Sequence, residues 1–166
     1  MILGMSLSTF TLVHVVLSLV GIVAGLVVLF GMFGSKSLDG WTGLFLATTV
    51  LTSVTGYFFP SDRILPSHIV GAISLIVLAI ALLALYARHL AGHWRWIDVV
   101  AATVALYLNV FVGVVQAFQK LPFLQQLAPN QSEPPFLIAQ IAMLLIFIVL
   151  GALSIKRFHP MMSAAR

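Results

Sequence analysis

The chain of 166 residues contains no cysteine and very little charge. Without cysteine it cannot form disulfides, thiolate metal sites or cysteine-based catalytic centres. Asp, Glu, Lys and Arg make up only 7% of the residues, against 61% hydrophobic ones, and the mean hydropathy is +1.16. This composition leaves no room for a separate soluble domain, so residues 1–166 are expected to form a single transmembrane domain.

Charge is missing altogether from five long stretches, at 1–35, 40–61, 64–87, 99–119 and 134–155. A helix needs about twenty apolar residues to cross a hydrocarbon core of roughly 30 Å, so each stretch is long enough to span it. The sequence therefore predicts an all-α integral membrane protein, a bundle of five transmembrane helices at about 8–33, 41–59, 67–90, 97–119 and 135–156. The first run lacks a basic segment before it, so we expect a retained helix rather than a cleaved signal peptide.

The few cations are divided unequally between the two sides of such a bundle. Arg63 and Lys120 fall on the N-terminal side, whereas the opposite side holds Lys36, Arg88, Arg95, Lys156, Arg157 and Arg166. Positively charged loops stay in the cytoplasm, so we expect an outer N-terminus and a cytoplasmic C-terminus in a bacterial inner membrane. Because these cations flank apolar runs, they indicate anchoring at the membrane surface and no nucleic-acid partner. The tryptophans share the cytoplasmic boundary, at Trp41, Trp94 and Trp96.

Polar residues recur at helical spacing inside the apolar runs. In the first run, one narrow face carries His14, Ser18, Gly21 and Gly25. One face of the fourth helix, with its two flanking charged residues, carries Asp98, Asn109, Gln116 and Lys120. Because lipid tails offer no hydrogen bonds, such faces are expected to point into the bundle. The polar face of the fourth helix is thus predicted to be the most buried side of any helix.

The depth of these residues in the membrane indicates a common layer. Chain direction alternates from helix to helix, so the position within each run gives the leaflet that a side chain occupies. Each of the five helices places a polar group at one level of the outer leaflet, and Asn109 lies below it, near the midplane. The sequence therefore predicts a ligand site formed by His14, Ser18, Tyr57, His68, Asn109, Gln116 and Gln140.

Two classes of ligand suit this layer. His14 and His68, at matching depth on two helices, would bind the iron of one b-type haem from its two faces. A quinone or lipid-like molecule is the alternative, because His, Tyr and Gln side chains hydrogen-bond a carbonyl while apolar walls hold its tail. Either ligand is consistent with a redox role. The histidines also have a plainer use, which is to donate hydrogen bonds to the backbone or to a threonine hydroxyl.

Other roles are less well supported by the sequence. His89 and His93 have metal-ligand spacing, but in the boundary segment RHLAGHWRW they are more typical of membrane anchors. P-loop, serine-hydrolase and zinc-protease motifs are absent, so whether the protein is an enzyme stays undecided. The alternatives are an accessory subunit of a membrane complex, with or without homo-oligomers, and a small-solute or proton carrier. The carrier is disfavoured because no acid or base lies near the midplane.

Overall fold

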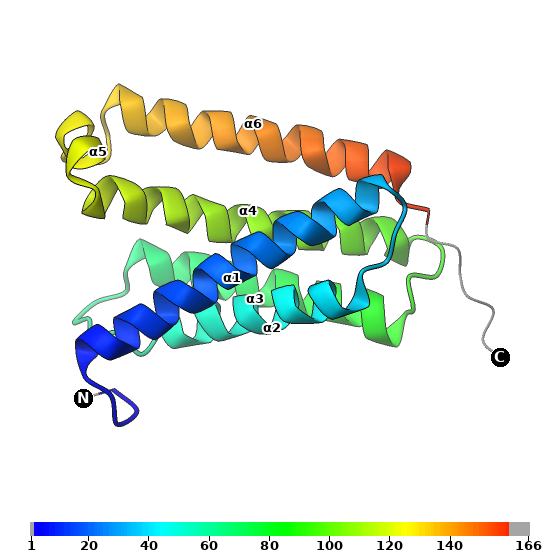
Figure 1. Ribbon diagram of the computed structural model, residues 1–166, viewed down its shortest axis with the longest axis horizontal. Helices are drawn as coiled ribbons and strands as arrows, with labels where there is room; N and C mark the ends of the chain where they lie inside the picture. Colours follow the sequence, from blue (N-terminus) through cyan, green and yellow to red (C-terminus); the bar gives the residue numbers. More distant parts are fainter. Residues whose placement is uncertain (1, 160–166) are drawn as a thin grey trace.

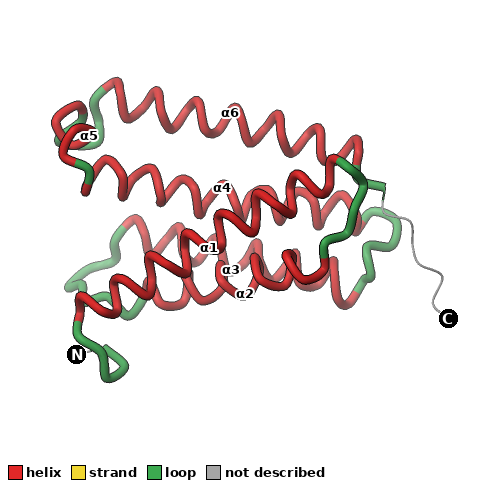
Figure 2. Tube along the Cα trace, viewed as in Figure 1, coloured by secondary structure: helices red, strands yellow, loops and turns green. Residues whose placement is uncertain are grey.

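The structure is a computed structural model that describes residues 2–159. One of the predicted cytoplasmic cations, Arg166, lies outside the described residues. Helices make up 78% of the described part, which contains no strand. Figure 1 and Figure 2 show long helices laid side by side and joined by short loops at the two ends of the bundle.

The long helices fall where the charge-free stretches predict them. They are α1 (Leu7–Phe33), α2 (Asp39–Gly56), α3 (Pro66–Leu82) with the π-helical turn η1 (Leu83–Ala87), α4 (Trp94–Lys120) and α6 (Pro134–Arg157). The connection after α4 forms a short helix, α5 (Pro122–Leu127). Helix ends differ from the predicted ones by three residues at most, and α2 ends earlier than expected.

The helix ends are set by ordinary capping chemistry. Ser6 precedes α1, and its hydroxyl accepts a hydrogen bond from the backbone N–H of Thr9. Pro66 and Pro134 open α3 and α6, because proline has no N–H to lose in the first turn and its φ angle already suits a helix. Three of the five long helices, α1, α3 and α6, therefore begin at a residue that the sequence itself marks.

Four of the long helices are long and apolar enough to cross a membrane, namely α1, α3 with η1, α4 and α6. The 18 residues of α2 do not qualify, because five threonines and a serine interrupt the apolar sequence. Large apolar side chains cover the outside of the bundle, as Leu12, Val23, Ile76 and Ile138 illustrate. So much exposed apolar surface is typical of a protein embedded in lipid. The chain is therefore an all-helical protein of the membrane-embedded class.

Helix α4 lies at the centre of the bundle and packs against α1, α3 and α6 (Figure 1). It contributes nine of the described buried residues, more than any other helix. Asp98, Ala102, Ala105 and Asn109 are among them, so the predicted burial of this face is confirmed over that length. Towards the end of the helix the prediction is wrong, because Gln116 and Lys120 are exposed. Between these two residues, Phe118 is buried instead and packs edge-on against Phe136 of α6.

Close packing between α1, α2 and α4 depends on one glycine. A Cβ atom at Gly25 would lie 2.6 Å from Cδ1 of Leu106 and 2.9 Å from the ring of Phe45. Both of these side chains are buried, with 1% of their surface exposed. Small residues allow transmembrane helices to approach in this way. In contrast, a Cβ atom at Gly43 in α2 would meet nothing within 4 Å.

We predict that Gly25→Ala lowers the thermal unfolding midpoint of the detergent-solubilised protein. Overpacking of a filled core costs about 1–3 kcal/mol, because the neighbouring side chains are forced from their preferred rotamers. The matched variant Gly43→Ala is expected to unfold at or slightly above the wild-type midpoint, since alanine favours a helix over glycine by about 1 kcal/mol. Equal midpoints for the two variants would contradict the role given to Gly25.

Candidate functional site

Polar groups of α1, α2 and α4 meet at Asn109. The hydroxyl of Ser18 donates a hydrogen bond to Oδ1 of Asn109 over 3.0 Å. Gly21 lies beside them, and a Cβ atom there would be 3.0 Å from Nδ2 of Asn109, 3.1 Å from Oγ1 of Thr48 and 3.2 Å from Oγ1 of Thr49. Two of the predicted site residues, Ser18 and Asn109, are therefore in direct contact. The absence of a side chain at Gly21 is what allows the three helices to bring these groups together.

A half-enclosed cavity of about 80 Å³ lies next to this cluster, in the half of the bundle where α1 begins. Side chains of four helices line it: His14, Thr49, Thr52, Ser53, Ser67, Val70, Gly71, Ser74, Leu108, Asn109 and Val112. Seven of these eleven residues carry a polar side chain. Such a concentration is unusual between helices whose outer faces are apolar, and it marks the cavity as the candidate site.

Three buried polar atoms at the cavity have no hydrogen-bond partner within the described part of the protein. They are Oγ1 of Thr49, Oγ1 of Thr52 and Nδ2 of Asn109. In contrast, the hydroxyl of Ser53 donates to that of Ser74 over 3.2 Å. Buried polar groups are normally paired, because an unpaired one costs about 1–3 kcal/mol. The three residues line the cavity, and their unpaired atoms, themselves buried, are hydrogen-bonding capacity that the described residues leave unused beside it.

His14 completes the polar wall with an acceptor. Its Nδ1 lies 2.8 Å from Oγ1 of Thr55, and the Thr55 hydroxyl in turn lies 2.7 Å from the carbonyl oxygen of Leu51. The hydroxyl has one proton, which it donates to Leu51, so its oxygen accepts from the Nδ1–H of His14. A neutral imidazole protonated at Nδ1 leaves Nε2 as a free acceptor. The side chain of His14 is half-buried, and the ring of Phe59 packs edge-on against it, with the centroids 5.1 Å apart.

His68 has different neighbours and the opposite protonation pattern. Its ring stacks on that of Tyr57, with the centroids 5.4 Å apart. The Tyr57 hydroxyl donates a hydrogen bond to the backbone carbonyl oxygen of His68 over 2.7 Å. The backbone N–H of Leu65 donates to Nδ1 of His68, so the ring proton resides on Nε2. The predicted residues Tyr57 and His68 are thus brought together, as a clasp between the end of α2 and the start of α3. His68 does not line the cavity that His14 lines.

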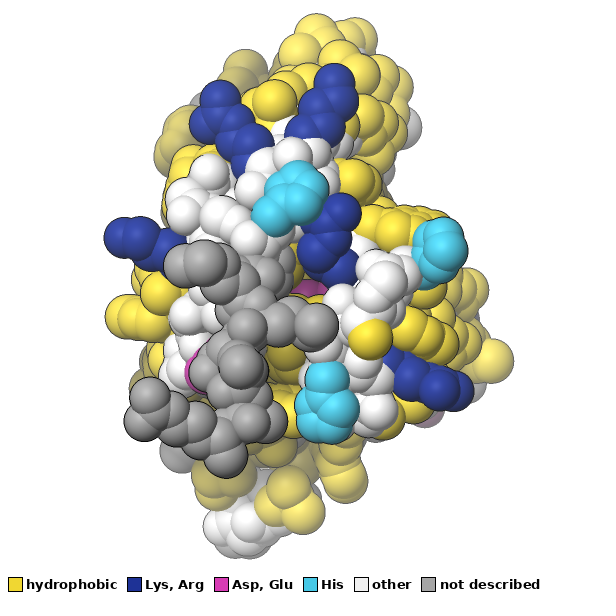
Figure 3. All heavy atoms as spheres, turned by 90° about the vertical axis from the view of Figure 1, so that its right-hand side faces the viewer, with side chains coloured by type: hydrophobic (Ala, Val, Ile, Leu, Met, Phe, Trp, Pro, Cys, Tyr) yellow, Lys and Arg dark blue, Asp and Glu magenta, His cyan; other side chains and the backbone are white. Residues whose placement is uncertain are grey.

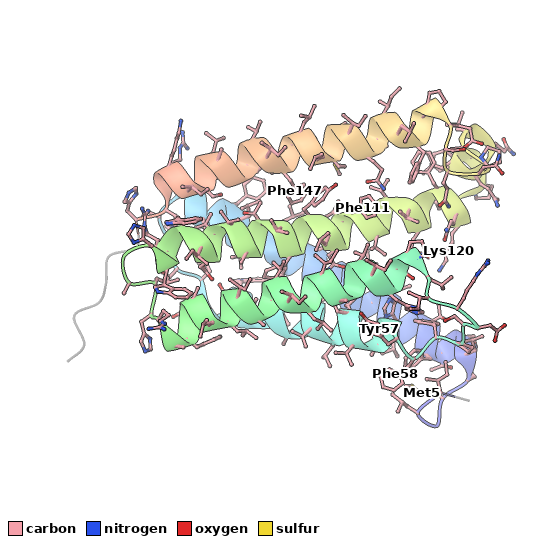
Figure 4. All side chains as sticks on the ribbon, turned by 180° about the vertical axis from the view of Figure 1, so that it is seen from behind. Met5, Tyr57, Phe58, Phe111, Lys120 and Phe147 are labelled. Atoms are coloured by element: carbon pink, nitrogen blue, oxygen red, sulfur yellow. The ribbon has the colours of Figure 1, made fainter. Side chains whose placement is uncertain are left out.

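The two glutamines of the predicted layer lie elsewhere. Gln140 of α6 is buried, and its amide donates to the carbonyl oxygen of Phe111 over 3.3 Å. Figure 4 shows Phe111 between α4 and α6, away from Tyr57. Gln116 is exposed. The structure therefore places His14 and Asn109 at the cavity, with Ser18 bonded to Asn109, and leaves the glutamines outside it.

The other candidate groups form no further cluster. His89 and His93 are exposed, and within residues 2–159 no group of three or more His, Cys, Asp or Glu side chains could hold a metal ion. Glu133 accepts hydrogen bonds from the backbone of Asn130 and Ser132. Desolvation acts to raise the pKa of Glu133, but these hydrogen bonds lower it below its ordinary value. The carboxylate therefore stays charged and holds the loop before α6.

Sequence reasoning did not single out Ser74 as a polar residue of α3. It lies seven residues after Ser67, two helical turns along the same face, and that spacing was the available signal. Comparison of the chain with protein-family models, with curated proteins and with solved structures found no match.

We predict an energetic coupling between Ser18 and Asn109. Ser18→Ala leaves Oδ1 of Asn109 without its donor and should lower the free energy of unfolding in detergent. In an Asn109→Leu background the same change should cost less, with a difference of about 0.6 kcal/mol, the average for such hydrogen bonds in membranes. The control cycle pairs Ser18→Ala with Val110→Leu on the neighbouring face, where the two effects should add. Additive effects in both cycles would contradict the hydrogen bond.

Proposed function

We propose that this chain is a five-helix integral membrane protein that binds a quinone-like molecule in the polar cavity of its outer half. The argument for a fifth crossing is topological. Helices α1 and α3 run in the same direction along the bundle (Figure 1), so the segment between them must return across the membrane. Helix α2 is that segment. Its hydroxyls avoid lipid, since Thr48 and Thr55 donate to carbonyls of their own helix and Ser53 donates to Ser74.

Charge supports the orientation that we propose. The end of the bundle that carries the loops after α1 and η1, and the end of α6, gathers Lys, Arg and His side chains (Figure 3). By the preference of basic loops for the cytoplasm, this end faces inwards and the polar cavity lies in the outer leaflet. We propose the bacterial inner membrane as the location.

The unpartnered atoms at the cavity carry the proposal of a quinone. The amide of Asn109 and the hydroxyls of Thr49 and Thr52 can donate to a carbonyl oxygen, whereas Nε2 of His14 can accept from a hydroxyl. Donors next to an acceptor suit both a quinone and its quinol. A benzene ring needs a cavity of about 150 Å³ to be enclosed, so a cavity of about 80 Å³ takes the oxygen-bearing edge of the ring.

The histidines favour a quinone over a b-type haem. Iron would bind Nε2 of both rings, which requires a free lone pair there. Nε2 of His14 has one, but Nδ1 of His68 accepts the N–H of Leu65, so its proton is held on Nε2. Iron at Nε2 of His68 would therefore require the hydrogen bond from the Leu65 N–H, which caps α3, to break first. His14 and His68 also belong to different clusters, one at the cavity and one in the clasp with Tyr57.

The alternatives make different use of the same residues. In an accessory subunit the cavity would hold only water; at about 30 Å³ each, two or three molecules fill it. A carrier for protons or small solutes would need a path onwards to the other end. Gly25, Phe45 and Leu106 close that path, since the space between them leaves no volume for a water molecule. We therefore rank the carrier last.

We predict that fusions at the C-terminus report a cytoplasmic location in a bacterial host. Alkaline phosphatase fused after residue 159 should be inactive and green fluorescent protein at the same site should fluoresce. Alkaline phosphatase inserted in the loop after α5 should be active, because it lies on the opposite side. Active phosphatase at the C-terminus would overturn the proposed orientation.

We predict saturable binding of a short-chain quinone to the purified protein, measured by equilibrium dialysis in detergent. Asn109→Leu should weaken this binding about tenfold, the effect of losing one well-placed hydrogen bond. Val110→Leu, on the neighbouring face of α4, should bind like the wild type. Equal affinities for the two variants, or no saturable binding at all, would end the proposal.

An absorption spectrum of the same sample separates quinone from haem. The quinone proposal expects no Soret band. A Soret band that survives purification and disappears in both His14→Ala and His68→Ala would establish a haem site instead.

A further inference from the structure

A second, apolar groove lies between α4 and α6, in the half of the bundle opposite to the polar cavity. Its volume is about 290 Å³, roughly twice that of a cavity that encloses a benzene ring. Its walls include Val100 and Val104 of α4 and Phe147, Ile148 and Ala152 of α6. The side chain of Ile148 is 57% exposed, so the groove is open to the outside of the bundle.

The groove forms beside a point where the two helices touch. A Cβ atom at Gly151 would lie 3.1 Å from Cγ2 of Thr103, so α4 and α6 are in close contact there. The hydroxyl of Thr103 donates to the carbonyl oxygen of Val99, which removes it from the groove. Towards the middle of the membrane the groove ends at Tyr107, whose ring packs against that of Phe147 with the centroids 5.7 Å apart. The result is a short, apolar channel along the helices that suits an alkyl chain.

Positive charge gathers at the open end of this groove. Ile155, the last groove residue on α6, is followed directly by Lys156 and Arg157, both exposed. Arg95 donates to the carbonyl oxygen of Phe158, which ties the start of α4 to the end of α6. Figure 3 shows Lys and Arg side chains gathered at the level of α6 on this end of the molecule.

The two ends of the bundle differ in net charge. Among the described residues, the end near the groove holds five Lys or Arg side chains and two carboxylates, whereas the other end holds two of each. An apolar channel that opens beside excess positive charge is complementary to a molecule with alkyl chains and an anionic head. We propose that an anionic phospholipid binds here, with one acyl chain in the groove between α4 and α6 and its headgroup beside Lys156. This inference holds whichever ligand the polar cavity binds.

Thermal unfolding in a neutral detergent tests the proposal, with phosphatidylglycerol or phosphatidylcholine added at equal concentration. Phosphatidylglycerol should raise the unfolding midpoint of the wild type more than phosphatidylcholine does. Lys156→Gln should weaken the apparent affinity for phosphatidylglycerol about fivefold, the effect of one basic residue near an anionic headgroup. Lys120→Gln, at the other end of the bundle, should leave that affinity unchanged.

A second pair of variants tests the groove itself. Ala152→Leu places a larger side chain in the channel and should abolish the phosphatidylglycerol-dependent rise. Ala142→Leu makes the same change on the opposite face of α6, outside the groove, and should retain the rise. Equal responses to the two lipids in the wild type, or a full response in Ala152→Leu, would overturn the proposal. A wild-type dimer that becomes monomeric in Ala152→Leu would assign the groove to a second copy of the chain and overturn it as well.

Discussion

Hydrocarbon offers no partner for a hydrogen bond, so each polar group inside this bundle must find its partner within the protein. Several threonine hydroxyls find that partner in their own helix. The hydroxyls of Thr48, Thr55 and Thr103 donate to carbonyl oxygens four residues earlier in their own helices. Such bonds need no second helix, so Thr48 and Thr55 of α2 can pack among apolar neighbours.

Among the described residues, five buried polar atoms have no partner; three of them lie at the cavity, and the other two are Oε1 of Gln140 and Oγ of Ser154. Asn109 has no carbonyl of its own helix as partner, and its amide is shared between Ser18 on one side and the cavity on the other. Thr49 and Thr52 lie next to it, and their hydroxyls are likewise unpaired within the described residues. These atoms differ in this respect from the hydroxyls of Thr48, Thr55 and Thr103, which pair within their own helices. Three unpaired atoms around one cavity, against single ones at Gln140 and Ser154, support the proposal that the cavity binds a ligand.

Sequence reasoning predicted the positions of the helices and the burial of the polar face of α4 from Asp98 to Asn109, because both depend on properties of single segments. Hydropathy gives the length of each helix, and periodicity shows which face is polar. The position of His14 and His68 within their apolar runs predicted their depth along the helices. The rotation of each helix about its axis, and the choice of neighbours, were not available from these signals. They depend on which surfaces fit, as at Gly21 and Gly25, where a missing side chain decides how near α2 and α4 approach.

The same limit explains why the expected layer of polar residues divides. Gln140 lies at a suitable depth, but α6 packs mainly against α4, so its amide reaches Phe111 and not the cavity. Depth alone therefore does not make two residues neighbours in a bundle of this size. The lateral position of each helix decides which residues become neighbours. Here it places a polar cavity and an apolar groove in different halves of the bundle. Four helices enclose a polar cavity towards one end, two helices frame an apolar groove towards the other, and the packed layer of Phe45 and Leu106 keeps the polar cavity from continuing through the bundle.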